Sequence, residues 1–165
     1  MLTKEELEAN NRRFSAAFTG GQLSSTPARG VVVLTCMDAR MDPVRMLGLR
    51  DGDAHILRNA GGRVSEDTVR SIVISQQLLH TRQIFVIHHT KCGLLNVTND
   101  ELRQKIGPAL GPRATTMDFL PLGPDVTASV RQDVARLRDA GVLAPGSEVH
   151  GYVYDVSTGR ITAVD

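Results

Sequence analysis

The sequence predicts an α/β fold with three layers, in which helices flank a mostly parallel central β-sheet and an antiparallel strand closes its C-terminal edge. Two observations lead to this prediction. The apolar runs at 31–34 and 84–87 are short and uninterrupted, which is typical of strands buried on both faces of a parallel sheet. Segments with helical periodicity alternate with such runs, and this order predicts parallel crossovers. We expect a single domain over residues 1–165.

The first half of the chain opens with a helix over 3–19. Thr3 and Glu6 have the spacing of a capping box, and the glycine pair at 20–21 ends the helix. Three further elements are expected in this half: a strand at 31–34, one or two helical turns at 43–49, and a second strand at 54–57.

The second half opens with a helix that runs from Ser65, a favourable N-cap residue, to His80 and carries a mostly apolar stripe. The elements expected after it are a strand at 83–88, a helix at 94–106, a Gly- and Pro-rich loop at 107–124, a helix at 125–140, and a hairpin of strands at 149–156 and 160–164. A loop of that length is usually functional or docked on another surface.

Composition excludes several classes of partner. With 19 basic and 18 acidic residues the net charge is +1, so no strong field favours nucleic acid or a membrane surface. The chain has no tryptophan and 4% aromatic residues, which argues against a platform for stacked bases. It shows neither a signal-peptide pattern nor an apolar run long enough to span a membrane, so we expect a cytoplasmic protein. Two cysteines in that compartment favour metal binding or catalysis over a disulfide.

Chemically reactive side chains follow two of the predicted strands. Cys36, Asp38 and Arg40 come after the first strand at alternate positions, and would share one side of an extended chain. His89 and Cys92 come after the third strand. Because ligands bind outside the carboxyl ends of strands in open α/β sheets, we expect the two clusters to form one site.

Two cysteines and one histidine form a ligand set that catalytic zinc sites use. We assign Cys36, His89 and Cys92 as ligands, and prefer His89 over His88 because of its spacing to Cys92. Two alternatives are simpler: the cysteines could be buried apolar thiols, and Asp38 with Arg40 only a structural ion pair.

Asp38 and Arg40 would control the reaction. Two thiolates cancel the charge of the zinc ion, so its bound water needs help from a neighbouring group. Asp38 can accept the proton of zinc-bound hydroxide while Arg40 holds the carboxylate away from the metal by a bidentate pair. Without that pair, Asp38 would become a fourth ligand and close the site. The reaction indicated is attack of zinc-bound hydroxide on a small electrophile.

These residues resemble the β-class carbonic anhydrases, whose signature is C-x-D-x-R followed by H-x-x-C. Three further stretches resemble that family: Arg-Asn-Ala-Gly-Gly at 58–62, the helix around 129–134, and 149–156 with the Thr-Gly at 158–159. The resemblance covers the chain from about Val31 onwards, and the short length is similar to the compact microbial branch.

The resemblance implies zinc on Cys36, His89 and Cys92, and reversible hydration of CO2 to bicarbonate and a proton. It also implies a homodimer or a higher even oligomer, with the cleft at the subunit interface and the first helix reaching onto the partner. Gly61 and Gly62 would lie on the substrate side. Asp38 and Arg40 would form the dyad that gates the site.

Three positions depart from the family pattern. Pro27 stands where plant-type members carry a substrate-side glutamine, Lys91 lies between the ligands where acidic or small polar residues are common, and His88 replaces a frequent glycine. Related proteins of this fold hydrolyse carbon disulfide, so a hydrolase for CS2 or COS is an alternative function. A non-enzymatic interaction module stapled by zinc, with Asp38 as permanent fourth ligand, is another.

Overall fold

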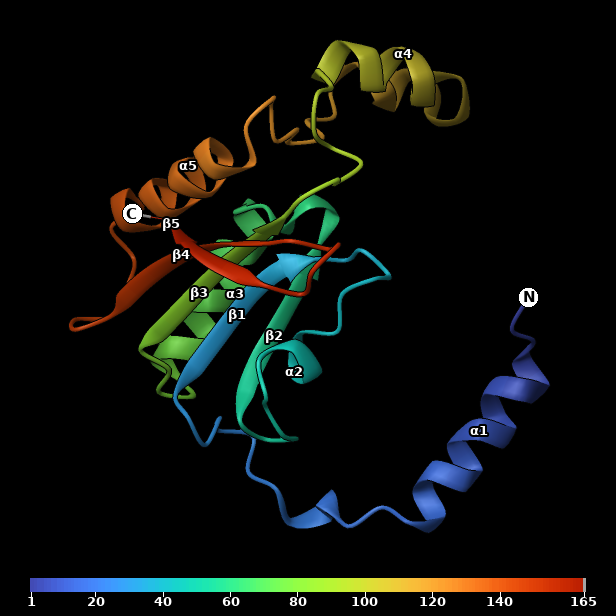
Figure 1. The fold of residues 1–165 in the computed structure, drawn as a ribbon, viewed down its shortest axis with the longest axis vertical. Helices are drawn as coiled ribbons and strands as arrows, with labels where there is room; N and C mark the ends of the chain where they lie inside the picture. Colours follow the sequence, from blue (N-terminus) through green and yellow to red (C-terminus); the bar gives the residue numbers. More distant parts are fainter. Residues whose placement is uncertain (165) are drawn as a thin grey trace.

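A computed structural model describes residues 1–164, and in this part of the chain five strands form one sheet in the order β2-β1-β3-β4-β5 (Figure 1). The strands are β1 (Val31–Cys36), β2 (Ala54–Asn59), β3 (Gln83–His89), β4 (Glu148–Tyr154) and β5 (Ile161–Val164). The first four run parallel, and β5 pairs antiparallel with β4. The predicted fold class is therefore confirmed.

Helices α3 (Glu66–Gln77) and α5 (Val126–Asp139) cover one face of the sheet. Strand side chains alternate between faces, so every second residue of β1, β3 and β4 points toward these helices. The fully buried members of this core are Val32, Leu34, Val64, Ile72, Ile84, Val86, Val130 and Leu137. Figure 1 shows α3 behind the strands, and both helices pack against the same core.

The opposite face of the sheet carries the short helix α2 (Pro43–Met46). A hollow of about 250 Å³ remains on this face, with apolar walls that include Val33, Leu49, Phe85 and Tyr152. Within the described part of a single chain, the only helix that covers this part of the sheet face is α2, which is one turn long.

Helix α1 (Lys4–Ala16) lies apart from the sheet and has no buried residue (Figure 1). Its predicted capping box is present, because Thr3 Oγ1 accepts from the Glu6 amide at 3.2 Å and Glu6 Oε2 accepts from the Thr3 amide at 2.8 Å. The apolar side chains of Leu7, Phe14 and Phe18 are exposed along this segment. The helix ends three residues before the predicted boundary.

The predicted helix at 94–106 is displaced. Helix α4 spans Asn99–Leu110, because Thr98 and Glu101 form a complete capping box that sets its start. The preceding residues instead bridge to the segment before α5, through Leu95 with Gly123 and through the Leu122 amide to the Leu94 carbonyl at 3.0 Å. The loop expected at 107–124 is accordingly shorter. Its first residues belong to the last turn of α4 and to the 3₁₀ turn η3 (Gly111–Thr115).

Candidate metal centre

Two neighbouring strand ends supply the candidate metal ligands. Strands β1 and β3 are adjacent and parallel, so their carboxyl ends meet at one edge of the sheet. Cys36 is the last residue of β1, His89 is the last residue of β3, and Cys92 lies in the turn that follows. Ligand atoms of these three residues all lie within 4.8 Å of one another, and all three residues are buried. The structure therefore brings the three predicted ligands together.

The orientation of His89 fits a metal ion. Its Nδ1 lies 2.9 Å from the carbonyl oxygen of Thr90, and because a carbonyl only accepts, Nδ1 carries the hydrogen. The lone pair is then on Nε2, which is buried and has no hydrogen-bond partner within the described residues. A buried polar atom without a partner is costly unless something binds it. With two thiols beside it, Nε2 fits a divalent ion such as zinc.

The two thiols differ in acidity. The hydrogen bond from Cys92 is the largest influence that lowers the pKa of Cys36, and the His89 side chain and then the backbone at Asp38 and Gly61 lower it further. The same interaction with Cys36 raises the pKa of Cys92. Thiolate is the form of cysteine that binds metals, so Cys36 is prepared by its surroundings to act as a ligand.

Asp38 and Arg40 form the bidentate pair that the sequence predicts. Arg40 Nε donates to Asp38 Oδ1 at 2.8 Å and Nη2 donates to Oδ2 at 2.7 Å, while the Arg40 amide also reaches Oδ1 at 2.9 Å. These bonds hold the pKa of Asp38 well below its usual range. The carboxylate lies close to the ligand cluster, with Oδ2 3.7 Å from His89 Nε2.

The prediction that Asp38 and Arg40 lie on one side of an extended strand is wrong. Strand β1 ends at Cys36, and the chain then turns, with the Met41 amide donating to the Asp38 carbonyl at 3.0 Å. Asp38 and Arg40 therefore meet across a turn and not along one side of a strand. The turn is possible because the chain leaves the sheet after the bond from the Met37 amide to the Asn59 carbonyl.

Arg58 organises this turn, a role that the sequence did not reveal. Its Nε donates to the Cys36 carbonyl at 3.0 Å and its Nη2 to the Asp38 carbonyl at 2.8 Å. The available signal was its place at the start of Arg-Asn-Ala-Gly-Gly at 58–62. The strand register explains the contact: β2 ends beside β1 with Asn59 opposite Cys36, so Arg58 lies next to the end of β1.

Cys36 and Cys92 line a hollow of about 660 Å³, whose walls also include Met37, Asp38, Arg40, Gly61 and Leu94. Gly61 lies on the wall of this hollow. Gly62 lies behind it, and a Cβ atom added there would approach the Cys36 amide nitrogen to 2.9 Å.

The three departures from the family pattern lie in different surroundings. His88 is fully buried and shares a hydrogen bond with Ser129, which places its side chain away from the ligands. Lys91 is exposed, and its Nζ donates to Ser157 Oγ at 2.8 Å. Pro27 is buried, and it is not among the residues that line the hollow at the ligands.

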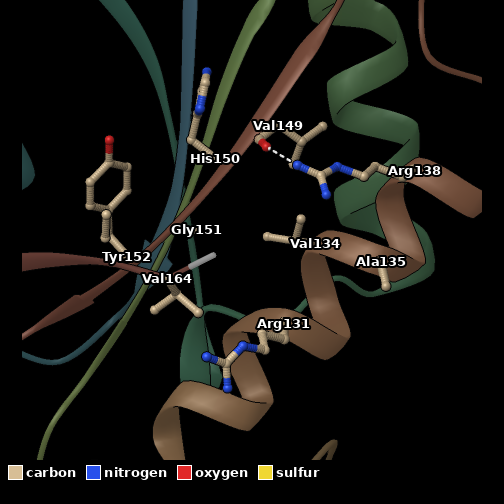
Figure 2. Close-up of a pocket in the computed structure, with 10 residues that line it drawn as sticks. Arg131, Val134, Ala135, Arg138, Val149, His150, Gly151, Tyr152 and Val164 are labelled. Carbon is tan, nitrogen blue, oxygen red and sulfur yellow. Dashed lines mark hydrogen bonds between the residues drawn. The ribbon is translucent and has the colours of Figure 1, made fainter.

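A second hollow, of about 360 Å³, lies between α5 and the β4–β5 edge. Figure 2 shows Arg131 and Arg138 of α5 at its border and Val134 pointing toward the sheet. Arg138 Nη2 donates to the Val149 carbonyl at 2.7 Å, so this guanidinium already binds the protein's own backbone. No cysteine lines this hollow, and the candidate chemistry therefore lies at the carboxyl ends of β1 and β3.

Fold and site together define a class: an α/β enzyme whose metal ligands come from two adjacent parallel strands, with an acidic residue fixed by arginine beside them. Comparison with known proteins identifies the class more closely. A family model described as carbonic anhydrase matches residues 31–117. Beta-carbonic anhydrase 1 of Mycobacterium tuberculosis is 38% identical over 99% of both chains.

Solved structures agree. The crystal structure of carbonic anhydrase from Streptococcus mutans matches with a TM-score of 0.90 and 40% identity, covering 100% of both chains. Carbon disulfide hydrolase of Acidianus sp. is also similar, with 33% identity over 81% of this chain and 76% of that protein. This chain belongs to the β-carbonic anhydrase family. None of its described helices is long and apolar enough to cross a membrane.

Proposed function

We propose that this chain catalyses the reversible hydration of CO2 to bicarbonate and a proton, with zinc held by Cys36, His89 and Cys92. The observation that carries the proposal is the buried Nε2 of His89, which has no partner among the described residues and faces two thiols. Two thiolates and one neutral imidazole leave one zinc position open. When bound, zinc supplies a Lewis acid that lowers the pKa of a water molecule in that position.

Asp38 would orient the attacking water. Its hydrogen bonds with Arg40 keep the carboxylate ionised, and an ionised carboxylate only accepts hydrogen bonds. Asp38 can therefore accept a hydrogen bond from the water and direct a lone pair of its oxygen toward the substrate. Arg40 would act as the gate, because loss of its bidentate pair would free Asp38 to turn toward the ligands and close the site.

The walls of the hollow suit a small uncharged substrate. Met37 and Leu94 supply apolar surface beside the ligands, and Gly61 leaves room where a side chain would intrude. A Cβ atom at Gly61 would lie 3.1 Å from Leu94 Cδ1. We propose that CO2 lies against Gly61, with Gly62 supporting this wall from behind.

A homodimer or a higher even oligomer is part of the proposal. Leu7 and Phe14 of α1, with Phe18 just after it, form an exposed apolar surface, and the sheet face near α2 has an apolar hollow. A second copy would bury both surfaces. The free cysteines favour a reducing compartment, and a cytoplasmic location can be tested by cell fractionation.

The experiment combines metal analysis with stopped-flow CO2 hydration. Purified protein should contain about one zinc per chain, and Cys36→Ser should lose both metal and hydration. His89→Ala should do the same, whereas His150→Ala, which removes a histidine bonded to Gln83 at 2.9 Å, should retain both. Hydration should rise from about pH 6 to 9 as bound water ionises and the form closed by Asp38 disappears. Zinc-replete protein without hydration in this range contradicts the proposal.

A hydrolase for CS2 or COS is the second candidate, favoured by the similarity to carbon disulfide hydrolases. Sulfide release from CS2 or COS, measured beside CO2 hydration on the same preparation, separates the two. A non-enzymatic module with Asp38 as permanent ligand is less compatible with the site, because Arg40 occupies both carboxylate oxygens. That module would bind zinc through four protein ligands even at alkaline pH.

A further inference from the structure

The two adjacent histidines at the end of β3 point in opposite directions. His88 is fully buried on the side of the sheet that α5 covers, and its Nδ1 lies 2.7 Å from Ser129 Oγ of that helix. Its Nε2 lies 3.2 Å from the Gly62 carbonyl oxygen and 3.2 Å from Asp133 Oδ2. Both of these oxygens only accept, so Nε2 carries a hydrogen and donates it to them.

Asp133 is fixed in place by Arg63. Arg63 Nε lies 3.0 Å from Asp133 Oδ2, Nη2 lies 3.1 Å from Oδ1, and the Val64 amide donates to Oδ2 at 3.1 Å. Both side chains are buried, so this ion pair is held without competition from water. Arg63 directly follows Gly61 and Gly62, which together form the glycine turn. His88 therefore holds this turn through the Gly62 carbonyl, and Asp133 holds the residues that follow it.

The glycine turn in turn contacts a metal ligand. Gly62 packs so closely that an added Cβ atom would lie 2.9 Å from the Cys36 amide nitrogen. Gly61 and Cys36 line the same hollow, and a hydrogen bond from the Gly61 backbone is one of the causes that lower the pKa of the Cys36 thiol. Any shift of the turn consequently changes a hydrogen bond to a ligand atom.

We propose that His88 is a positioning residue for the metal centre: by holding the Gly62 carbonyl, it fixes the Gly61 amide against the sulfur of Cys36. One histidine of the pair binds the metal, and the other sets the hydrogen bonding of a ligand on the neighbouring strand. The inference rests on the proposed zinc site. Partners that orient metal ligands typically change metal affinity about 10–100-fold when they are lost.

Two substitutions separate this role from simple packing. In His88→Gln the amide nitrogen occupies roughly the place of Nε2 and can donate to Gly62, whereas in His88→Asn it reaches only the Ser129 side. We expect zinc affinity, measured by chelator competition, to fall about 10-fold in His88→Asn and to stay near wild type in His88→Gln. In cobalt-substituted protein, the thiolate-to-cobalt charge-transfer band should shift only in His88→Asn. Ser129→Ala is the matched control and should leave the band in place.

Equal affinity and equal bands in the Gln and Asn variants would overturn the proposal. A measurement on the unaltered protein gives a second test that does not depend on the variants folding. In protein loaded with an NMR-active cadmium isotope, the Gly61 amide proton should show coupling to the metal through the Cys36 sulfur and slow exchange. A fast-exchanging, uncoupled Gly61 amide would refute the link. These readouts need no turnover, so wild type that binds zinc without hydrating CO2 would contradict only the proposed function.

Discussion

Replacing Gly62 by alanine probes the contact between the glycine turn and Cys36. The new Cβ would lie 2.9 Å from Cys36 N and 2.9 Å from Thr35 C, and these backbone atoms cannot rotate away. The φ angle of +69° adds a backbone cost of about 1–2 kcal/mol for an L-residue. Overpacking a tight core costs typically about 1–3 kcal/mol. We therefore expect Gly62→Ala to lower the free energy of unfolding by about 2–5 kcal/mol.

Gly141→Ala provides the control, because Gly141 has a φ of +66° and nothing within 4 Å of the added Cβ. This variant should lose only the backbone contribution, about 1–2 kcal/mol. Urea unfolding of both variants at one protein concentration measures the difference, since the stability of an oligomer depends on concentration. Zinc affinity should fall in Gly62→Ala alone. Equal losses of stability in the two variants would refute the close approach at Gly62.

Three further substitutions test other parts of the structure. Asp133→Ala leaves the charge of Arg63 buried without its partner, and should lower the free energy of unfolding by about 3–5 kcal/mol in urea titrations. Arg40→Ala removes the main cause of the low pKa of Asp38. Because a depressed pKa keeps the carboxylate ionised until the pH falls far below its ordinary value, wild type should show no loss of activity from protonation of Asp38 above about pH 4. In the variant kcat/KM should fall at neutral pH, because Asp38 is free to close the site, and the activity that remains should decline further near about pH 4 as Asp38 becomes protonated. Phe14→Asp should reduce the molar mass in sedimentation experiments to that of a single chain, and an unchanged mass would place α1 outside the interface.

The strands and the ligand set could be predicted because their signals are local. A short, continuous apolar run such as 31–34 predicts a buried strand, and the structure has β1 there. The expectation that the carboxyl ends of β1 and β3 meet needed only parallel pairing, which the structure confirms. Cys36, His89 and Cys92 were assigned on this basis, and they do converge.

The features that could not be predicted depend on contacts between distant residues. The ion pair of Arg63 with Asp133 joins positions 70 residues apart, and only the fold brings them together. The available signal was Asp133, an acidic residue within the apolar stripe of α5, but its position in the sequence does not show which residue it pairs with. The start of α4 was missed for a different reason. Leu94 and Leu95 looked like helix residues, whereas they pack on the cluster around the cysteines.

Lys91 shows that a departure from the family pattern can concern the backbone more than charge. Its φ angle is +55°, a left-handed conformation that L-residues adopt at a cost and that asparagine tolerates better. This conformation belongs to the turn in which the Lys91 carbonyl accepts from Arg40 Nη2 at 3.0 Å. The small polar residues common between the ligands therefore suit the backbone that the dyad requires.

Lys91→Asn should accordingly raise the free energy of unfolding by about 0.5–1 kcal/mol, because a several-fold preference for this conformation corresponds to that energy. Lys91→Gln is the matched control: it also removes the charge and the bond to Ser157, but it has no such preference. Urea titration of the two variants isolates the backbone contribution. If Gln stabilises the protein as much as Asn, charge and not conformation governs this position. If only Asn does, the left-handed conformation of the backbone governs it.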